Sequence, residues 1–344
     1  MSYSPSFDIT PQLLGTIEEV AVLRQQIADA SVELAWIPAL QKDSRMRNTH
    51  ASTAIEGNPL TLPEVRAIAD DTAPPARLPR SRQEVVNYLA GLRYIEQHAD
   101  AARITEDSVL QLHRILASDV MDQGFPGEYR SISVQVGRHR PPSPEAVSQL
   151  TRELIDWWNG PSRELSPVLT SAVVHYRLEA IHPFADCNGR IGRTLALWEL
   201  YRRGFDTHHI FSVDEFYWQG RERYYAELSK VDASDGELTS WLEYAAAGIR
   251  ATLEAVLDRI RRAGGEDGVR IALRPKQERL LQMLSAAGSM APREIWEALA
   301  ISRQGAMDLL NPLVDAGLVE KVGTRKTGRY RLRSVGSEGS GQDR

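Results

Sequence analysis

The sequence has little cysteine and no long apolar run. Cys187 is the one cysteine among 344 residues, which excludes an internal disulfide and a cysteine-based zinc site and fits a reducing, cytoplasmic environment. No apolar stretch approaches the roughly eighteen residues that a membrane span needs, so no membrane partner is expected. The first residues lack the basic and apolar regions of a secretory signal, so export is not expected either.

What is present is typical of a globular protein. Hydrophobic residues make up 42% and charged residues 25%, and the length suits two or three domains. Helix formers outnumber β-branched and aromatic runs, which predicts a mostly α protein. The net charge of −5 hides an asymmetry, because residues 270–344 carry 13 basic and 8 acidic side chains and the rest carries 28 and 38. This asymmetry points to a polyanion as a partner of the C-terminal part.

One stretch, from Ile181 to Arg193, concentrates chemically active side chains. The helix before it begins with Ser166 as N-cap and Pro167 at the first position, and Pro183 ends it because the residue before a proline avoids the α region. A second helix is predicted from about Gly189 onward. The loop between them therefore brings polar residues to a helix N-terminus, where free N–H groups attract anions.

The residues at this helix start predict a nucleotide site. Asp186 precedes the helix, and Arg190 and Arg193 lie one turn apart on its face. His182 stands on the other side of the loop, with an ordinary pKa that lets it accept a proton at neutral pH. Taken singly, each residue has a structural explanation as a cap, a buried histidine or a solvated charge. Together they fit a site that holds polyphosphate and a divalent cation beside a base.

The stretch His182-Pro183-Phe184-Ala185-Asp186-Cys187-Asn188-Gly189-Arg190-Ile191-Gly192-Arg193 resembles the signature loop of Fic proteins. It departs from that loop at Cys187, where the family usually has glycine. The resemblance implies a Fic-type helical bundle with a small β-hairpin flap. It also implies a protein adenylyltransferase, which transfers AMP from ATP to a Tyr, Ser or Thr hydroxyl of a protein target, itself included, and releases pyrophosphate.

The resemblance assigns roles within the loop. His182 is the catalytic base, and Asp186 holds Mg²⁺, a cation that prefers carboxylate and phosphate oxygens. Phe184 packs inward as a peg. The expected contacts to ATP phosphates come from the backbone N–H groups of Cys187, Asn188 and Gly189 and from the side chains of Arg190 and Arg193.

A second motif lies upstream, at Ser52 and Glu56. A short helix over about residues 47–57, ended by Gly57, places both residues on one face. By itself this is a common surface helix. Beside a Fic loop it resembles the family's inhibitory motif, in which Glu56 would form a bidentate pair with Arg193 and fill the γ-phosphate subsite.

The best strand signal lies after Arg130, where Ile132, Val134 and Val136 alternate with polar residues. The resemblance implies that residues 131–140 form a flap that docks the target segment by main-chain pairing. The expected docking residues are Ser133, Val134, Gln135 and Val136.

Apolar periodicity sets the expected domains. It predicts two helices over residues 11–45, and others over 81–98, from Thr105, from Ser143, over 214–230 and over 237–262. The expected domains are N-terminal helices over 1–75, a Fic core over 80–264 ended by a diglycine, a winged helix-turn-helix over 270–334 and a disordered tail over 335–344. The basic turn 323–329 of the winged domain binds DNA, forms a homodimer contact or is simply solvated.

Two alternatives for the whole chain remain at this stage. One is a DNA-binding regulator whose Fic core only senses nucleotide, and the other is an enzyme that removes AMP, with Glu56 positioning a water. The departure at Cys187 has two readings as well. A positive φ there would strain the loop, whereas an ordinary φ would only crowd the phosphates. Its place at a helix N-terminus predicts a lowered thiol pKa and a reactive thiol, and the alternative, which we favour, is a tolerated substitution with no role.

Overall fold

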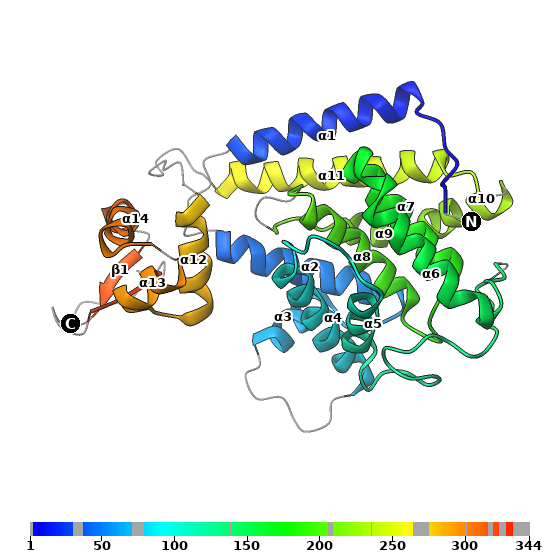
Figure 1. The fold of residues 1–344 in the computed structure, drawn as a ribbon, viewed down its shortest axis with the longest axis horizontal. Helices are drawn as coiled ribbons and strands as arrows, with labels where there is room; N and C mark the ends of the chain where they lie inside the picture. The colour runs from blue at the N-terminus through cyan, green and yellow to red at the C-terminus, as the bar shows by residue number, and fades with distance from the viewer. Residues whose placement is uncertain are drawn as a thin grey trace, which may run out of the picture. The chain divides into compact units, whose positions relative to one another are not determined.

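The computed structural model is mostly helical (Figure 1). It describes residues 3–29, 37–70, 79–137, 139–205, 209–234, 236–263, 275–299, 301–315, 319–322 and 328–332. The chain divides into two compact units, one of residues 1–28 and 43–257 and one of residues 29–42 and 258–344. Within the described ranges, no helix is both long and apolar enough to cross a membrane.

The N-terminal helices are α1 (Pro11–Asp29), α2 (Ile37–Ile55) and α3 (Leu62–Asp70). The prediction of a separate short helix near residues 47–57 is wrong, because that segment is the second half of the 19-residue α2. Neither glycine nor proline interrupts residues 41–55, so nothing breaks the helix there. Gly57, with φ +91°, ends it as predicted, and its N–H donates to the carbonyl of Ala54.

The next three helices are α4 (Arg80–Gln97), α5 (Glu106–Ala117) and α6 (Pro144–Asn159). The predicted cap at Thr105 is confirmed, since its hydroxyl accepts from the N–H of Ser108 at 3.1 Å. The Ser108 hydroxyl in turn accepts from the N–H of Thr105 at 2.9 Å. Proline occupies the first position of α6, where its missing N–H costs nothing.

The centre of the larger unit is the pair α7 (Pro167–Ile181) and α8 (Asn188–Arg202) (Figure 1). Both helices are buried on almost every side, as expected of helices that are apolar around most of their circumference. The largest buried side chains of this unit include Trp158, Trp198 and Trp241. The loop that joins α7 to α8 is therefore fixed at both ends by the core.

The last helices of this unit are α9 (Asp214–Gln219), α10 (Arg221–Ala233) and α11 (Thr239–Ala263). One helix over 214–230 was predicted, but the structure breaks it at Gly220. That residue caps the end of α9, and its φ of −110° and ψ of 40° are not helical. The break turns α10 so that Tyr224 and Val231 enter the core.

The smaller unit contains α12 (Pro275–Ala287), α13 (Pro292–Ala298), α14 (Arg303–Asp315), β1 (Val319–Val322) and β2 (Arg329–Leu332). The strands pair antiparallel, from Val319 with Leu332 to Val322 with Arg329. Leu280, Leu284 and Leu310 are fully buried in a core of its own. Three helices followed by a ribbon were predicted in this order. The predicted diglycine boundary, the turn 323–327, the connection 71–78 and the tail 335–344 lie outside the described residues.

The segment 131–140 is not a regular strand. Its described residues form a single antiparallel bridge between Val136 and His139 across Gly137, which has φ +57°. Ile132 and Val136 remain exposed, so the alternation does not mark a buried face. In place of the predicted half-hairpin, the segment forms a tight turn. Among the described residues, no strand lies beside residues 131–135 for them to pair with.

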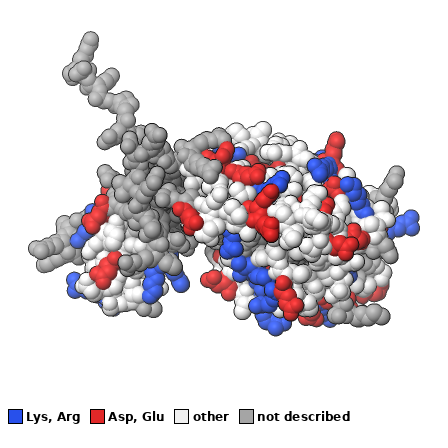
Figure 2. Space-filling view, turned by 90° about the horizontal axis from the view of Figure 1, so that it is seen from above, with Lys and Arg blue, Asp and Glu red and all other residues white. Residues whose placement is uncertain are grey.

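Charged side chains of both signs are interspersed over the face of the described residues in Figure 2. Many of them are paired, as in Arg47 with Asp43 and Arg250 with Glu19. The charges on this face of the described residues therefore do not indicate where a charged partner would bind.

Candidate active site

The loop between α7 and α8 is held by its own side chains. His182 ends α7 in the left-handed region, at φ +49°, and its N–H donates to Leu178 at 2.8 Å. The Asn188 amide accepts from the N–H of Phe184 at 2.9 Å and donates to its carbonyl at 2.8 Å. Phe184 is fully buried, which confirms the predicted peg. Asn188 thus clamps the loop through its side chain and leaves its N–H for the anion site.

Two residues that sequence reasoning missed hold the loop from outside. His113 of α5 stacks on Phe184 at 3.7 Å between ring centroids, accepts from the N–H of Gly127 and lies 3.2 Å from the carbonyl oxygen of Asp186. Arg130 donates to the carbonyls of His182 at 2.7 Å and Pro142 at 2.6 Å. A histidine on the apolar face of α5 was a usable signal for His113, whereas nothing in the sequence around Arg130 indicated its role.

The N-terminus of α8 holds a carboxylate. Glu56, just past the end of α2, directs Oε1 at Gly189, so closely that a β-carbon on that glycine would collide with it. The same oxygen accepts from Arg193 Nη2 at 2.8 Å. The predicted Glu56–Arg193 pair is present, although through one hydrogen bond and not as a bidentate pair. An anion therefore sits where the sequence predicted an anion-binding helix start.

Arg193 is fully buried and has several partners besides Glu56. Its Nε donates to the hydroxyl of Ser52 at 2.8 Å, and its Nη2 donates to the Ser52 carbonyl at 3.0 Å. Its Nη1 lies 3.5 Å from the hydroxyl oxygen of Tyr224. Ser52 was predicted to accompany Glu56, and the structure shows that it fixes the plane of the guanidinium.

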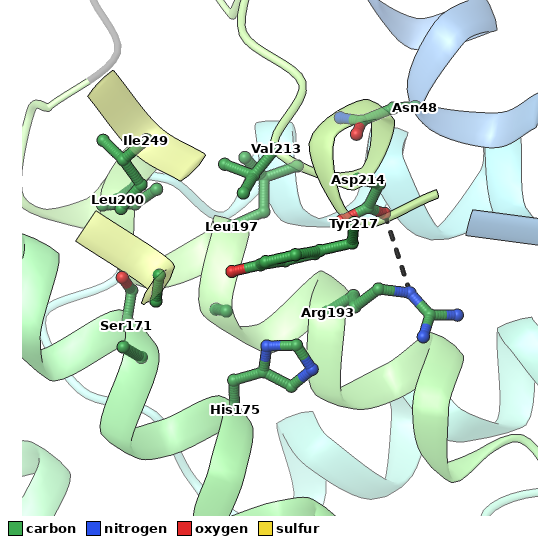
Figure 3. A pocket seen from close by; sticks show the side chains of 13 residues that line it. Asn48, Ser171, His175, Arg193, Leu197, Leu200, Val213, Asp214, Tyr217 and Ile249 are labelled. Atoms are coloured by element: carbon green, nitrogen blue, oxygen red, sulfur yellow. Dashed lines mark ion pairs between the residues drawn. The ribbon is translucent and has the colours of Figure 1, made fainter. Parts of the chain in front are cut away.

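A buried carboxylate lies behind this arginine. Asp214 of α9 is 3.9 Å from Arg193 Nε (Figure 3). It also accepts from the Tyr88 hydroxyl at 2.8 Å. A cavity of about 20 Å³ between them and His175 is large enough for one water molecule. Burial lowers the pKa of His175 to about 3, so its ring stays neutral there. Nothing in the spacing of the sequence indicates that Asp214 lies close to Arg193.

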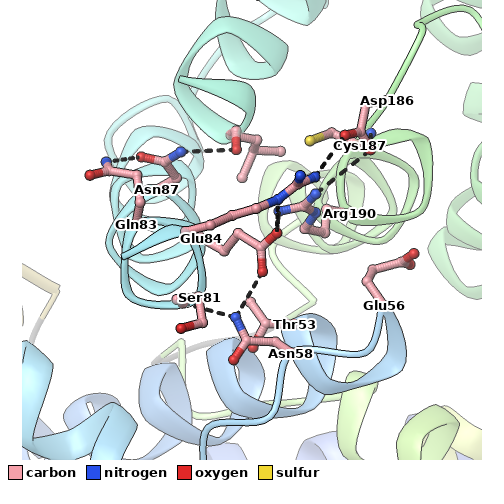
Figure 4. A network of polar contacts seen from close by, with 12 residues as sticks. Thr53, Glu56, Asn58, Ser81, Gln83, Glu84, Asn87, Asp186, Cys187 and Arg190 are labelled. Carbon is pink, nitrogen blue, oxygen red and sulfur yellow. Dashed lines mark hydrogen bonds and ion pairs between the residues drawn. The ribbon is translucent and has the colours of Figure 1, made fainter. Parts of the chain in front are cut away.

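Arg190 is buried with donors to spare. Its Nη1 is 3.6 Å from Glu84 Oε1, and its Nη2 is 3.9 Å from Asp186 Oδ1, both beyond hydrogen-bond distance (Figure 4). Among the described residues, its Nε and Nη1 have no hydrogen-bond partner. Glu84 meanwhile accepts from the Asn58 amide at 2.8 Å. Unpaired buried donors are costly, so this guanidinium is suited to binding an anion that satisfies them.

His182 is neutral at physiological pH. Burial lowers its pKa to about 4, with Arg130 acting in the same direction. Its Nδ1 lies 3.8 Å from Glu179 Oε2 and has no hydrogen-bond partner among the described residues. An uncharged imidazole at this position is able to accept a proton from a neighbouring hydroxyl.

Asp186 presents a half-buried carboxylate at the mouth of the loop. Its Oδ1 accepts from the N–H of Cys187 at 2.6 Å, and its Oδ2 lies 3.4 Å from Arg80 Nη2. The described residues contain no group of three or more His, Cys, Asp or Glu side chains arranged to hold a metal. A divalent cation here would therefore take one carboxylate from the protein and its other ligands from phosphate and water.

Cys187 adopts a positive φ of +65°. Of the two alternatives for this position, the strained loop is therefore the one that the structure shows. Its thiol is buried against Ala117 and Val120. Burial raises its pKa to about 12, and Arg190 only partly offsets that effect. The prediction of a lowered thiol pKa is wrong, because the side chain turns into the core and away from the helix N-terminus.

A larger cavity, of about 330 Å³, opens beside the loop. Its lining includes Val136 and His139 from the turn after Arg130, Glu179 from α7, and Tyr225 and Asp232 from α10. Asp232 lies 3.0 Å from His139 and accepts from the Tyr176 hydroxyl at 3.0 Å. Of the predicted docking residues, Val136 lines this cavity, and Ser133 and Gln135 are exposed.

The chain is similar in sequence to known proteins of one family. Residues 103–200 match the model of the Fic/DOC family. Protein adenylyltransferase fic-1 of Caenorhabditis elegans is 30% identical over 223 residues, 62% of this chain and 42% of that protein. Protein adenylyltransferase Fic of Nematostella vectensis is 32% identical over 223 residues, 63% of this chain and 49% of that protein. The chain thus spans less than half the length of these two relatives.

Solved structures show the same fold. A Fic family protein from Desulfovibrio desulfuricans is 27% identical, with a TM-score of 0.66, over 98% of this chain and 100% of that one. Fic-1 of Caenorhabditis elegans is 25% identical, with a TM-score of 0.61, over 73% of this chain and 72% of that one. The loop from His182 to Arg193 lies inside residues 103–200, so the similarity to the Fic/DOC family includes the whole loop.

Proposed function

We propose that this chain is a protein adenylyltransferase that transfers AMP from ATP to a hydroxyl group of a protein and that Glu56 inhibits it. One observation carries the proposal. The carboxylate of Glu56 occupies the N-terminus of α8 against Gly189 and pairs with Arg193. A helix N-terminus that already has a carboxylate against it, paired with a buried arginine, is equipped for a phosphate in its place.

The phosphates of ATP would be bound by groups that are already in place. The N–H groups at the start of α8 and the spare donors of Arg190 suit the α- and β-phosphates, and Arg193 suits the γ-phosphate. Because Arg193 is held by Ser52 and Asp214, it keeps its position when Glu56 leaves. Preorganised charge of this kind is what phosphoryl-type transfer requires.

The nucleoside would enter the cavity beside the loop. Its volume of about 330 Å³ lies within the range of small-molecule sites, and Tyr225 and Val136 give it an apolar, aromatic lining. Glu179 borders this cavity and also lies near His182. The cavity therefore adjoins the loop where the phosphates would lie, as one bound nucleotide requires.

The chemical step needs a base for the attacking hydroxyl. His182 is held by Arg130 through its carbonyl and is neutral at physiological pH, so it can take the proton as the hydroxyl oxygen bonds to the α-phosphorus and pyrophosphate leaves. Asp186 would hold Mg²⁺, which supplies charge neutralisation for the phosphates when bound. Its half-buried carboxylate at the loop mouth fits that task.

The target segment would lie along residues 133–136. They end at the bridge residue Val136, and their backbone can pair with an extended peptide. Such pairing uses main-chain groups, so it places the acceptor hydroxyl near His182 without choosing the target by sequence. The chain itself is then one available target.

The C-terminal unit supports a winged helix-turn-helix, with α13 and α14 as the helix pair and β1–β2 as the wing. Its described arginines are largely paired: Arg329 with Glu294 at 2.8 Å and Arg331 with Glu320 at 2.6 Å. The face in Figure 2 likewise carries both signs on this unit. DNA binding and homodimer contact both remain proposals for it. A salt titration of DNA binding by the full chain separates them, because phosphate contacts weaken steeply with salt.

Labelled ATP tests the enzyme directly. The full chain is incubated with Mg²⁺ and ATP labelled at the α-phosphate, and label on the protein is compared among wild type, Glu56→Gly and Glu56→Gly/His182→Ala. If the Glu56 contact opposes ATP by about 3 kcal/mol, its loss raises labelling roughly a hundredfold. Labelling that Glu56→Gly does not raise contradicts the inhibitory role. Labelling that survives His182→Ala within tenfold contradicts the role of His182 as base.

A further inference from the structure

A second carboxyl group lies beside the phosphate site. Glu179 is on α7, one turn before His182, and its side chain is only 16% exposed. A β-carbon on Gly192 would lie 2.8 Å from Glu179 Oε1. The carboxyl group of Glu179 therefore packs against α8 at Gly192, as that of Glu56 packs against it at Gly189. Gly189 and Gly192 are one helical turn apart on the same face. Two carboxyl groups therefore flank the turn of α8 that ends in Arg193.

The surroundings of Glu179 favour a protonated carboxyl. Among the described side chains, Oε1 of Glu179 is a buried oxygen without a hydrogen-bond partner. Burial raises its pKa from 4.5 to about 8, Arg193 opposes that rise, and Glu56 adds to it. An unpaired carboxylate is costly at such a position, because nothing replaces the water it loses.

Ionisable groups lie around Glu179 on every element packed against it. They are Arg193 from α8, Glu56 from the end of α2, His175 and Tyr176 from α7 itself, Tyr224, Tyr225 and Asp232 from α10, His139 from the turn, and His182 from its own loop. Arg193 is the one cation of this set that is buried, and it already faces Glu56 and Asp214. Within this set, the only buried cation available to an ionised Glu179 is therefore Arg193, which Glu56 and Asp214 already share.

We propose that Glu179 is a second acidic group of the phosphate site, which admits the nucleotide while it carries a proton and opposes it once that proton is lost. This inference rests on the proposed function. The proton leaves through the adjoining cavity, which Glu179 lines. The resulting charge competes with the γ-phosphate for Arg193 and repels the polyphosphate, whereas the neutral acid does neither.

The test is the pH dependence of nucleotide affinity. Binding of ATP with Mg²⁺ is measured by calorimetry in the full-length Glu56→Gly variant, with and without Glu179→Gln, at about pH 7 and about pH 9. Glutamine keeps the shape of the acid and cannot ionise. We expect the affinity of Glu56→Gly for ATP to fall about tenfold between these two pH values. The reason is that one buried negative charge beside the polyphosphate has a repulsive effect of that order. With Glu179→Gln the affinity should stay constant.

Glu222→Gln, an exposed carboxylate of α10, serves as the control and should keep the pH dependence of the parent. An equal fall in affinity with and without Glu179→Gln overturns the inference. So does a loss of binding on Glu179→Gln already at about pH 7, because the neutral amide should behave as the neutral acid does. Absence of ATP binding by Glu56→Gly at either pH instead contradicts the proposed function itself, so the two failures are distinct.

Discussion

The carboxylate of Glu56 occupies the space that a β-carbon on Gly189 would need, and its Oε1 is held there by Arg193 Nη2 at 2.8 Å. Glycine is therefore required at this position for two reasons. It admits the inhibitory carboxylate, and it would admit a phosphate oxygen in the place of that carboxylate. A residue with a side chain would close the subsite to both.

Gly189→Ala should imitate the steric effect of Glu56 without its charge. In the Glu56→Gly background we expect transfer to fall tenfold or more, chiefly through a higher KM for ATP, because the new methyl group fills the γ-phosphate subsite. Steady-state labelling at several ATP concentrations measures this. Gly15→Ala, at a helical position with nothing within 4 Å, is the matched control and should leave the rate unchanged. A double variant that is as fast as Glu56→Gly alone would show that phosphate binds elsewhere.

Asp214→Asn should destabilise the protein strongly. Arg193 is fully buried, and the loss of a buried counter-charge typically costs about 3–5 kcal/mol. Urea unfolding of wild type and variant at neutral pH measures the difference in free energy. Tyr88→Phe removes only the hydrogen bond to Asp214 and should cost about 1–2 kcal/mol. Equal costs for both changes would mean that Glu56 and Ser52 suffice to hold the arginine.

Glu179→Gln should stabilise the protein at alkaline pH. The folded state raises the pKa of this carboxyl from 4.5 to about 8, so between these values the folded state binds a proton that the unfolded state has released. Stability therefore falls as pH rises through this window, by about 5 kcal/mol in all, and levels off above it. Urea unfolding of wild type and variant should give similar values near pH 4.5 and diverge by about pH 8. A difference in unfolding free energy between the two proteins that does not change with pH would contradict the raised pKa of Glu179.

The sequence predicted the elements that follow from local chemistry. The Thr105 cap, the helix stop at Gly57, the inward Phe184 and the approach of Glu56 to Arg193 are all present. These features depend on motifs of a few residues whose physical effect is local or shared by a family. The Glu56–Arg193 contact joins distant segments, and only the resemblance made it predictable.

What the sequence could not provide came from packing between distant elements. Asp214, His113 and Arg130 contact the site from α9, α5 and an irregular segment, and no spacing along the chain relates them to it. The direction of the Cys187 thiol was missed for the same reason. Whether it faces phosphate or core depends on the φ of one residue, and that is set by the tertiary fold.

Arg130→Lys should loosen the catalytic loop. The guanidinium donates to the carbonyls of His182, Pro142 and Ile132, and a lysine cannot reach all three in one fork. We expect a loss of about 2–3 kcal/mol in stability and at least tenfold slower transfer in the Glu56→Gly background. Unfolding and labelling assays measure the two effects. Arg140→Lys, at an exposed position of the same segment, is the control and should change neither. Full activity with the lysine would show that the loop is rigid without this anchor.

The strain at Cys187 can be separated from the burial of its thiol. Cys187→Ala keeps the positive φ of +65° and removes the sulfur, whereas Cys187→Gly removes both the sulfur and the steric cost of the β-carbon. A β-carbon in the left-handed region costs about 1–2 kcal/mol, so the glycine variant should be more stable than the alanine variant by about 1 kcal/mol. Urea unfolding of the three proteins measures this difference. In the Glu56→Gly background the glycine variant should also transfer AMP at least as fast as its parent.

Thiol reactivity gives an independent check on the same side chain. With a pKa of about 12 and a buried sulfur, native Cys187 should react with iodoacetamide far more slowly than the unfolded chain at the same pH. Mass spectrometry of alkylated samples, with and without urea, follows the modification. Rapid alkylation of the native protein would show that the thiol faces the helix N-terminus after all. In that case the thiol would contact the phosphates directly, and the glycine variant should lose the sensitivity of transfer to alkylation.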